Sequence, residues 1–120
     1  MEEENRIAAA ERLVKAAEDY LNGTGYRTEE LLEELLWETL VLFQGCSFYT
    51  AKKLEFQYTI KRNEMFVSRK NKSITRATVN VAFRKLLELG CAVSGPKKLG
   101  TFGASYVYAV FLGLGLVRAE

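Results

Sequence analysis

Residues 54–60, with the sequence LEFQYTI, alternate apolar and polar side chains. This two-residue period is typical of a β-strand that buries one face. The polar residues 61–64 follow as a turn, and the apolar residues 65–67 provide a returning strand. The stretch therefore predicts a β-hairpin, and residues 47–50 are a candidate for a further short strand before it.

Helical periodicity precedes the hairpin. Residues 5–21 and 28–43 each place apolar side chains at three- and four-residue spacing, which is typical of amphipathic helices. Thr28 is a predicted N-cap, and Glu29 and Glu30 suit the positive end of the helix dipole. The apolar face of the second helix is wide, so we expect it to need more than one neighbour or another subunit to cover it.

A third helix is predicted after the hairpin, at residues 74–89, with Ser73 as its N-cap and Gly90 at its end. Residues 104–117 are apolar, and their alternating leucines and glycines favour a strand over a helix. The predicted fold class is α+β, with two N-terminal amphipathic helices, a β-hairpin, a third helix and a C-terminal strand or wing region. Residues 1–120 are expected to form a single domain.

The composition argues against an enzyme. The chain has no histidine, so it lacks the commonest general base and the commonest transition-metal ligand. Asp19 is the only aspartate, and no glycine-rich stretch has the spacing of a phosphate-binding loop. Cys46 and Cys91 lie far apart and are predicted to be small buried thiols. We therefore predict no catalytic residue, no metal site, no cofactor and no small-molecule substrate.

The expected location is cytoplasmic, with no membrane partner. Glutamates rather than a secretory signal follow the first methionine. The longest apolar run, residues 106–117, is shorter than the roughly 20 residues that a membrane-spanning helix needs.

Charge is unevenly distributed. Residues 1–50 carry 4 basic and 11 acidic side chains, whereas residues 51–100 carry 12 basic and 3 acidic ones. Such asymmetry can mark an anionic partner. It can equally arise because the two halves attract each other within one fold, and the sequence leaves both interpretations open.

Several basic side chains occupy positions that suit phosphate binding. Arg69, Lys70 and Lys72 come just before the start of the third helix, where side-chain charge and unbonded backbone amides can meet one phosphate. The lysines of the hairpin have an alternative explanation, because charges on an edge strand discourage aggregation.

A stretch of the third helix resembles a known DNA-binding pattern. The sequence TRATVNVAFRKL at residues 75–86, Gly90 and the sequence GTF at 100–102 resemble the recognition helix and wing of winged helix-turn-helix regulators, the GntR type especially. The resemblance covers residues 73–103. It implies that the major groove would be faced by Thr75, Arg76, Thr78 and Asn80. It also implies that Lys97 and Lys98 would lie at the tip of the wing.

The leading hypothesis is therefore a small, non-enzymatic DNA-binding protein, a candidate transcriptional regulator that acts as a homodimer. In this hypothesis Arg76 and Asn80 would read bases. The phosphates would be held by Arg69, Lys70, Lys72, Lys97 and Lys98. The wide face of the second helix or the C-terminal apolar segment would join the subunits.

Two other hypotheses remain. The first alternative is a protein-interaction or self-assembling module with no nucleic-acid partner, in which the aromatic residues form core and interface. The second is that the protein binds single-stranded nucleic acid on the hairpin, with Phe56 or Tyr58 stacking on bases. That last hypothesis requires the two rings to be exposed.

Overall fold

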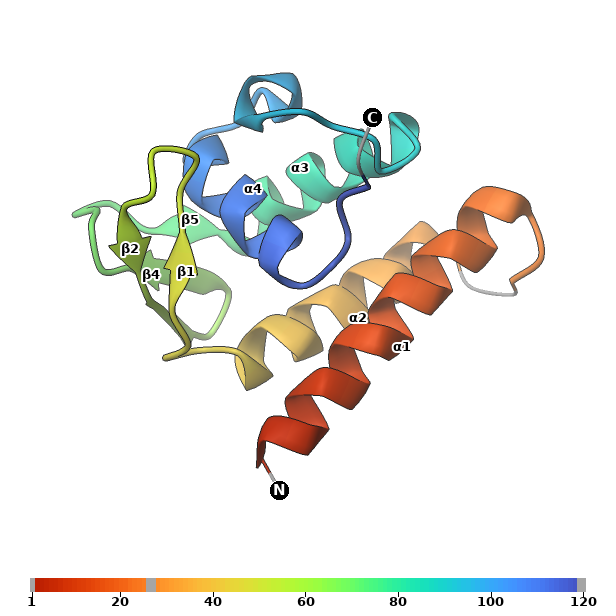
Figure 1. Cartoon of the computed structure of the whole chain (residues 1–120), viewed down its shortest axis with the longest axis horizontal. Helices are drawn as coiled ribbons and strands as arrows, with labels where there is room; N and C mark the ends of the chain where they lie inside the picture. Colours follow the sequence, from red (N-terminus) through yellow and green to blue (C-terminus); the bar gives the residue numbers. More distant parts are fainter. Residues whose placement is uncertain (1, 26–27, 119–120) are drawn as a thin grey trace.

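The computed structural model describes residues 2–25 and 28–118, and its elements form an α+β fold (Figure 1). The elements are the helices α1 (Glu2–Asn22), α2 (Glu29–Leu42), α3 (Arg76–Glu88) and α4 (Ala104–Gly113), the 3-10 helix η1 (Pro96–Leu99) and the strands β1 (Phe48–Tyr49), β2 (Glu55–Phe56), β3 (Tyr58–Lys61), β4 (Glu64–Val67) and β5 (Ile74–Thr75). The predicted N-terminal helices, hairpin and third helix are thus confirmed. In the part of the chain that the structure covers, no helix is long and apolar enough to cross a bilayer.

Helices α1 and α2 lie side by side as a helical hairpin, and the C-terminal end of α2 adjoins the strands (Figure 1). Thr28 is the N-cap of α2, as predicted, because its hydroxyl oxygen accepts a hydrogen bond from the Leu31 amide at 3.3 Å. At the other end of α2, the Tyr58 hydroxyl donates to the Leu40 carbonyl at 2.6 Å. This buried bond joins the helical hairpin to the strands.

The alternating stretch contributes to two sheets rather than to one strand. Before Gln57, β2 pairs antiparallel with β1; after it, β3 pairs antiparallel with β4. The backbone amide of Gln57 instead donates to the Ser68 hydroxyl oxygen at 3.0 Å, so the chain passes from one sheet to the next at this residue. The short strand expected within residues 47–50 is confirmed as β1.

The start of the third helix differs from the prediction. Residues expected in its first turn form β5 instead, which pairs with β4 through Met65 and Ile74. Thr75 is the N-cap, and its hydroxyl oxygen accepts from the Thr78 amide at 3.2 Å. The predicted cap, Ser73, donates its hydroxyl to the Glu64 carboxylate. A partner strand offering backbone hydrogen bonds therefore outweighs local helix propensity at this position.

The C-terminal segment also corrects the prediction, because residues 104–113 form helix α4 and not a strand. Residues 94–103, where a wing was expected, contain η1 and turns rather than a strand. Residues 107–111 of α4 are buried at every position. A helix that is covered on all sides shows no amphipathic period, so its apolar run cannot be distinguished from a strand by pattern alone.

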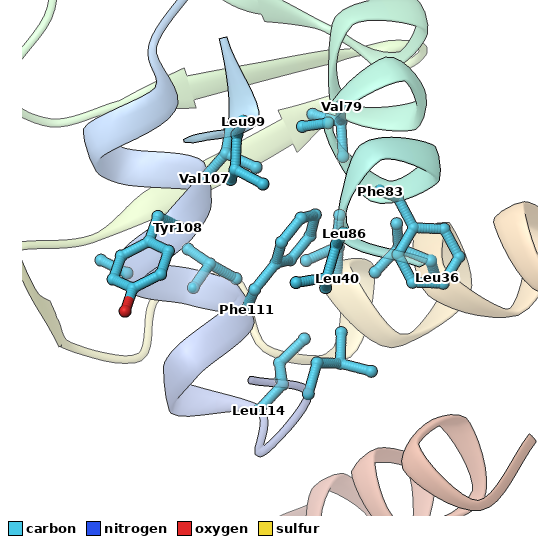
Figure 2. Packing of buried hydrophobic residues seen from close by; sticks show 14 of the residues in the cluster. Leu36, Leu40, Val79, Phe83, Leu86, Leu99, Val107, Tyr108, Phe111 and Leu114 are labelled. Carbon is cyan, nitrogen blue, oxygen red and sulfur yellow. The ribbon is translucent and has the colours of Figure 1, made fainter. Parts of the chain in front are cut away.

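Helix α4 packs at the centre of the hydrophobic core (Figure 2). Its Phe111 ring meets the Phe83 ring of α3 edge-on, with 6.0 Å between the ring centres. Leu36 and Leu40 of α2 approach the same cluster, whereas the Tyr108 hydroxyl points away from it and donates to the Val93 carbonyl at 3.1 Å. Buried residues of all four described helices thus belong to one core.

Candidate nucleic-acid interface

The acidic helices neutralise little of the basic half of the chain. Of the twelve basic side chains in residues 51–100, Arg76 and Arg84 form ion pairs with carboxylates of α2. The other ten form no ion pair within residues 2–25 and 28–118, and they are Lys52, Lys53, Lys61, Arg62, Arg69, Lys70, Lys72, Lys85, Lys97 and Lys98. Direct ion pairs between the two halves therefore involve only two of the twelve basic side chains.

Arg84 is held between α3 and α2. Its guanidinium lies 3.2 Å from one Glu33 carboxylate oxygen, makes a shorter bond to the other, and lies 3.6 Å from Glu29. The hydrogen bond to Glu33 raises the pKa of Arg84, and the attraction of that carboxylate adds to the effect. Only 8% of the Glu33 side chain is exposed, so Arg84 supplies the counter-charge for a buried carboxylate.

Arg76, a predicted base reader, is engaged inside the fold. Its guanidinium carbon lies 5.3 Å from the centre of the Trp37 ring, in cation–π geometry. The same group lies 3.9 Å from a Glu34 oxygen and donates to the Asn63 side chain at 3.4 Å. The side-chain oxygen of Asn80, Oδ1, is buried and has no hydrogen-bond partner among the residues that the structure describes. The Arg76 guanidinium is therefore engaged by other residues of the fold, and the side-chain oxygen of the half-buried Asn80 is shielded from solvent.

The phosphate-binding candidates lie outside the core. Lys97 and Lys98 are exposed on η1, and Arg69 is exposed in the loop between β4 and β5. Arg69 also donates weakly to the Glu55 carbonyl at 3.5 Å. Thr75 is exposed but uses its hydroxyl oxygen to cap α3. The lysines and Arg69 are thus available to a ligand, whereas Thr75 has a structural partner.

Two of the predicted phosphate-binding lysines lie over the ring of an aromatic residue. The Lys70 ammonium lies 4.6 Å from the centre of the Phe102 ring and 5.8 Å from that of Tyr106, and the Lys72 ammonium lies 5.1 Å from the centre of Phe102. We call Lys70, Lys72, Phe102 and Tyr106 the cation–aromatic cluster. It combines residues that are about thirty positions apart in the sequence, from the β4–β5 loop and from the start of α4.

Gly103 fixes the position of this cluster. It adopts a left-handed conformation, with φ of +70°, directly after Phe102. An added Cβ would lie 2.5 Å from Cδ1 of Ile74, a fully buried residue of β5. The backbone next to Phe102 is therefore pressed against the end of the sheet, and only glycine fits both the space and the backbone angle.

The two cysteines offer little chemistry. Burial raises the pKa of the Cys91 thiol above its ordinary value, which disfavours the reactive thiolate at neutral pH. Cys46 is only half-buried, so the prediction of a buried thiol is right for Cys91 and wrong for Cys46. Among residues 2–25 and 28–118, no three side chains of the metal-binding types histidine, cysteine, aspartate or glutamate come together.

The chain was compared with protein-family models, with curated proteins and with solved structures. None of them matches. The assignment of an interface therefore depends on the charges and contacts of this chain alone.

The sequence did not predict that Phe102 and Tyr106 lie beside Lys70 and Lys72. The family resemblance places Phe102 in a wing strand, and the apolar pattern of residues 104–117 predicts a strand that includes Tyr106. A signal was present: an aromatic residue stands close to glycines at 100 and 103, in a segment rich in lysine. In contrast, Phe56 and Tyr58 are each only 1% exposed, so stacking on the hairpin is wrong for these two rings.

Proposed function

We propose that this protein is a non-enzymatic DNA-binding protein that holds the phosphate backbone with the basic side chains of residues 51–100. The observation that carries the proposal is that ten of these twelve cations form no ion pair with any carboxylate of the described chain. Cations on the surface attract polyanions and release their condensed counterions on binding. We propose that the protein uses this binding to regulate transcription.

The phosphate contacts are assigned to the exposed groups rather than to the third helix. Arg69, Lys70 and Lys72 in the β4–β5 loop would bind phosphates, together with Lys97 and Lys98 on η1. Arg76 and Asn80 do not support the proposal, because the Arg76 guanidinium is engaged with α2 and the side-chain oxygen of the half-buried Asn80 is shielded from solvent. Binding of this kind is expected to depend strongly on salt and weakly on sequence.

A triple alanine variant of Arg69, Lys70 and Lys72 should bind DNA more weakly than the wild type. The loss of three phosphate contacts is expected to flatten the plot of log affinity against log salt concentration by about 2–3 units, since each contact contributes roughly 0.9 for duplex DNA. Fluorescence anisotropy of a labelled duplex, titrated at several salt concentrations, measures this slope.

The matched control removes three positive charges from α1, through alanine at Arg6, Arg12 and Lys15. This variant has the same net charge as the first but keeps the β4–β5 loop intact. An equal loss of slope in both variants would show that net charge alone drives binding. A wild type that fails to bind duplex or single-stranded DNA at low salt would end the proposal.

Self-assembly is a second candidate, favoured by an apolar groove of about 520 Å³ between α1 and the end of α4. Its lining includes Ile7, Val14, Phe43 and Leu114. An adjoining hollow of about 340 Å³ shares Phe43 with it and includes Leu112, whose side chain is half exposed. The occupant in this proposal is a second copy of the chain, which would make the protein a homodimer.

Leu112→Asp should convert such a dimer into monomers, because a carboxylate in an apolar interface loses its hydration without gaining a partner. Sedimentation equilibrium across a range of protein concentrations measures the change. Leu54→Asp is the control, since Leu54 is also exposed but lines neither the groove nor the adjoining hollow. A wild type that stays monomeric at every concentration would rule out the homodimer.

A further inference from the structure

We propose that Phe102 is a stacking surface for an unpaired base, so that the preferred ligand is a single-stranded nucleic acid. This inference rests on the proposed nucleic-acid binding and adds the class of ligand to it. It depends on the cation–aromatic cluster, which neither the third helix nor the hairpin provides.

Phe102 has the exposure and the rigidity that stacking requires. Its side chain is 44% exposed, unlike most aromatic rings of the chain, which belong to the core. The residue that follows it, Gly103, is pressed against Ile74 of β5, and Leu99 of η1 is buried three residues before it. The ring is therefore presented to solvent from a backbone that is anchored on both sides.

The lysines of the cluster suit the phosphates on either side of a stacked base. The ammonium groups of Lys70 and Lys72 lie 4.6 Å and 5.1 Å from the centre of the Phe102 ring. An exposed cation–π contact is weaker than the stacking of a base on an aromatic ring. A base can therefore replace the ammonium groups on the ring, and the flexible lysine side chains can turn outward to the adjacent phosphates.

A duplex does not offer the surface that this cluster recognises. The faces of paired bases are covered by their neighbours in the stack, whereas a single strand can splay its bases outward onto an aromatic side chain. Lysines next to an exposed aromatic residue are the combination that single-strand-binding proteins use without reading sequence. Tyr106, whose ring centre lies 5.8 Å from the Lys70 ammonium, packs edge-on against the buried Phe56 ring, so Phe102 is the ring of the cluster that a base would meet.

The test compares a labelled oligothymidylate of about 12 nucleotides, within the usual site sizes, with a duplex of the same length. The wild type is expected to bind the single strand more tightly at equal salt. Phe102→Ala should weaken binding to the single strand by about 5- to 100-fold, and Phe102→Leu should do the same, because leucine keeps apolar area but offers no ring. Phe102→Trp should retain the affinity.

Phe66→Ala is the matched control, because Phe66 is a comparably exposed phenylalanine on β4 that is outside the cluster. Its affinity for the single strand should stay at the wild-type value. Trp37 fluorescence and circular dichroism of each variant establish that the fold is retained.

The outcomes separate the two proposals. If Phe102→Ala and Phe66→Ala both bind the single strand like the wild type, the stacking role is wrong while nucleic-acid binding stands. A wild type that prefers the duplex would also overturn the choice of ligand without touching the proposed function. If the wild type binds neither oligonucleotide at low salt, both proposals fail together.

Discussion

Replacing Gly103 with alanine is expected to lower the free energy of unfolding by about 2–5 kcal/mol. Two costs add at this position: an L-residue in the left-handed region costs roughly 1–2 kcal/mol, and crowding a packed site costs roughly 1–3 kcal/mol. The crowding is specific, since the new methyl group would lie 2.5 Å from Cδ1 of Ile74. Urea unfolding, followed by the fluorescence of the single tryptophan, measures the change.

Gly100→Ala is the matched control for this prediction. Gly100 has a similar left-handed backbone, with φ of +64°, but nothing lies within 4 Å of an added Cβ. It should therefore lose only the backbone cost, about 1–2 kcal/mol. The additional change Ile74→Ala, which removes the crowding atoms, should make Gly103→Ala less damaging than it is in the wild-type background. Equal losses for both glycines would mean that the contact with β5 is unimportant.

The second large effect concerns the buried carboxylate of Glu33. Arg84→Ala is expected to lower the free energy of unfolding, because it leaves that carboxylate without its principal counter-charge. Breaking a buried ion pair typically costs about 3–5 kcal/mol. The loss at Arg84 should be smaller than this, because half of its side chain is exposed, so water can enter and partly replace the guanidinium.

Two further variants isolate the pair. Lys85→Ala removes an adjacent, exposed charge that forms no ion pair in the described chain, and it should change stability by less than about 0.5 kcal/mol. The double variant Glu33→Gln, Arg84→Met should be more stable than Arg84→Ala, because no unpaired charge stays buried. A loss at Arg84 no larger than the loss at Lys85 would contradict the role given to the pair.

The contribution of Arg84 in this pair to the free energy of unfolding should also stay constant across neutral pH. A raised pKa in the folded state stabilises the protein below the pKa of the unfolded state and loses this effect only as pH rises through the folded value. The pKa of Arg84 is raised from a value that is already far above neutral. Titration of Arg84 therefore adds no pH dependence to unfolding near neutral pH.

The ion pairs divide the basic side chains of residues 51–100 into two groups. Arg84 and Arg76 do attract the acidic helices, through Glu33 and Glu34, whereas the lysines of the β4–β5 loop and of η1 do not. This difference was not visible in the sequence, where all twelve cations look alike. It arises because α3 packs against α2 while the loops project from the other elements.

The sequence by itself determined the elements whose signals are local. The periods of α1, α2 and the hairpin, the N-cap at Thr28 and the lack of histidine can each be recognised from residues a few positions apart. The helical state of α4 could not be recognised in this way, because its central residues 107–111 are all buried and the pattern carries no period.

Only the tertiary structure decided which side chains could meet a ligand. Phe102 is brought to Lys70 and Lys72 by the packing of Gly103 on β5, and Arg76 is turned toward Trp37 by the packing of α3 on α2. Such contacts join residues about thirty to forty positions apart. Local propensity acts over a turn or a strand, whereas burial and charge pairing depend on neighbours that only the folded chain supplies.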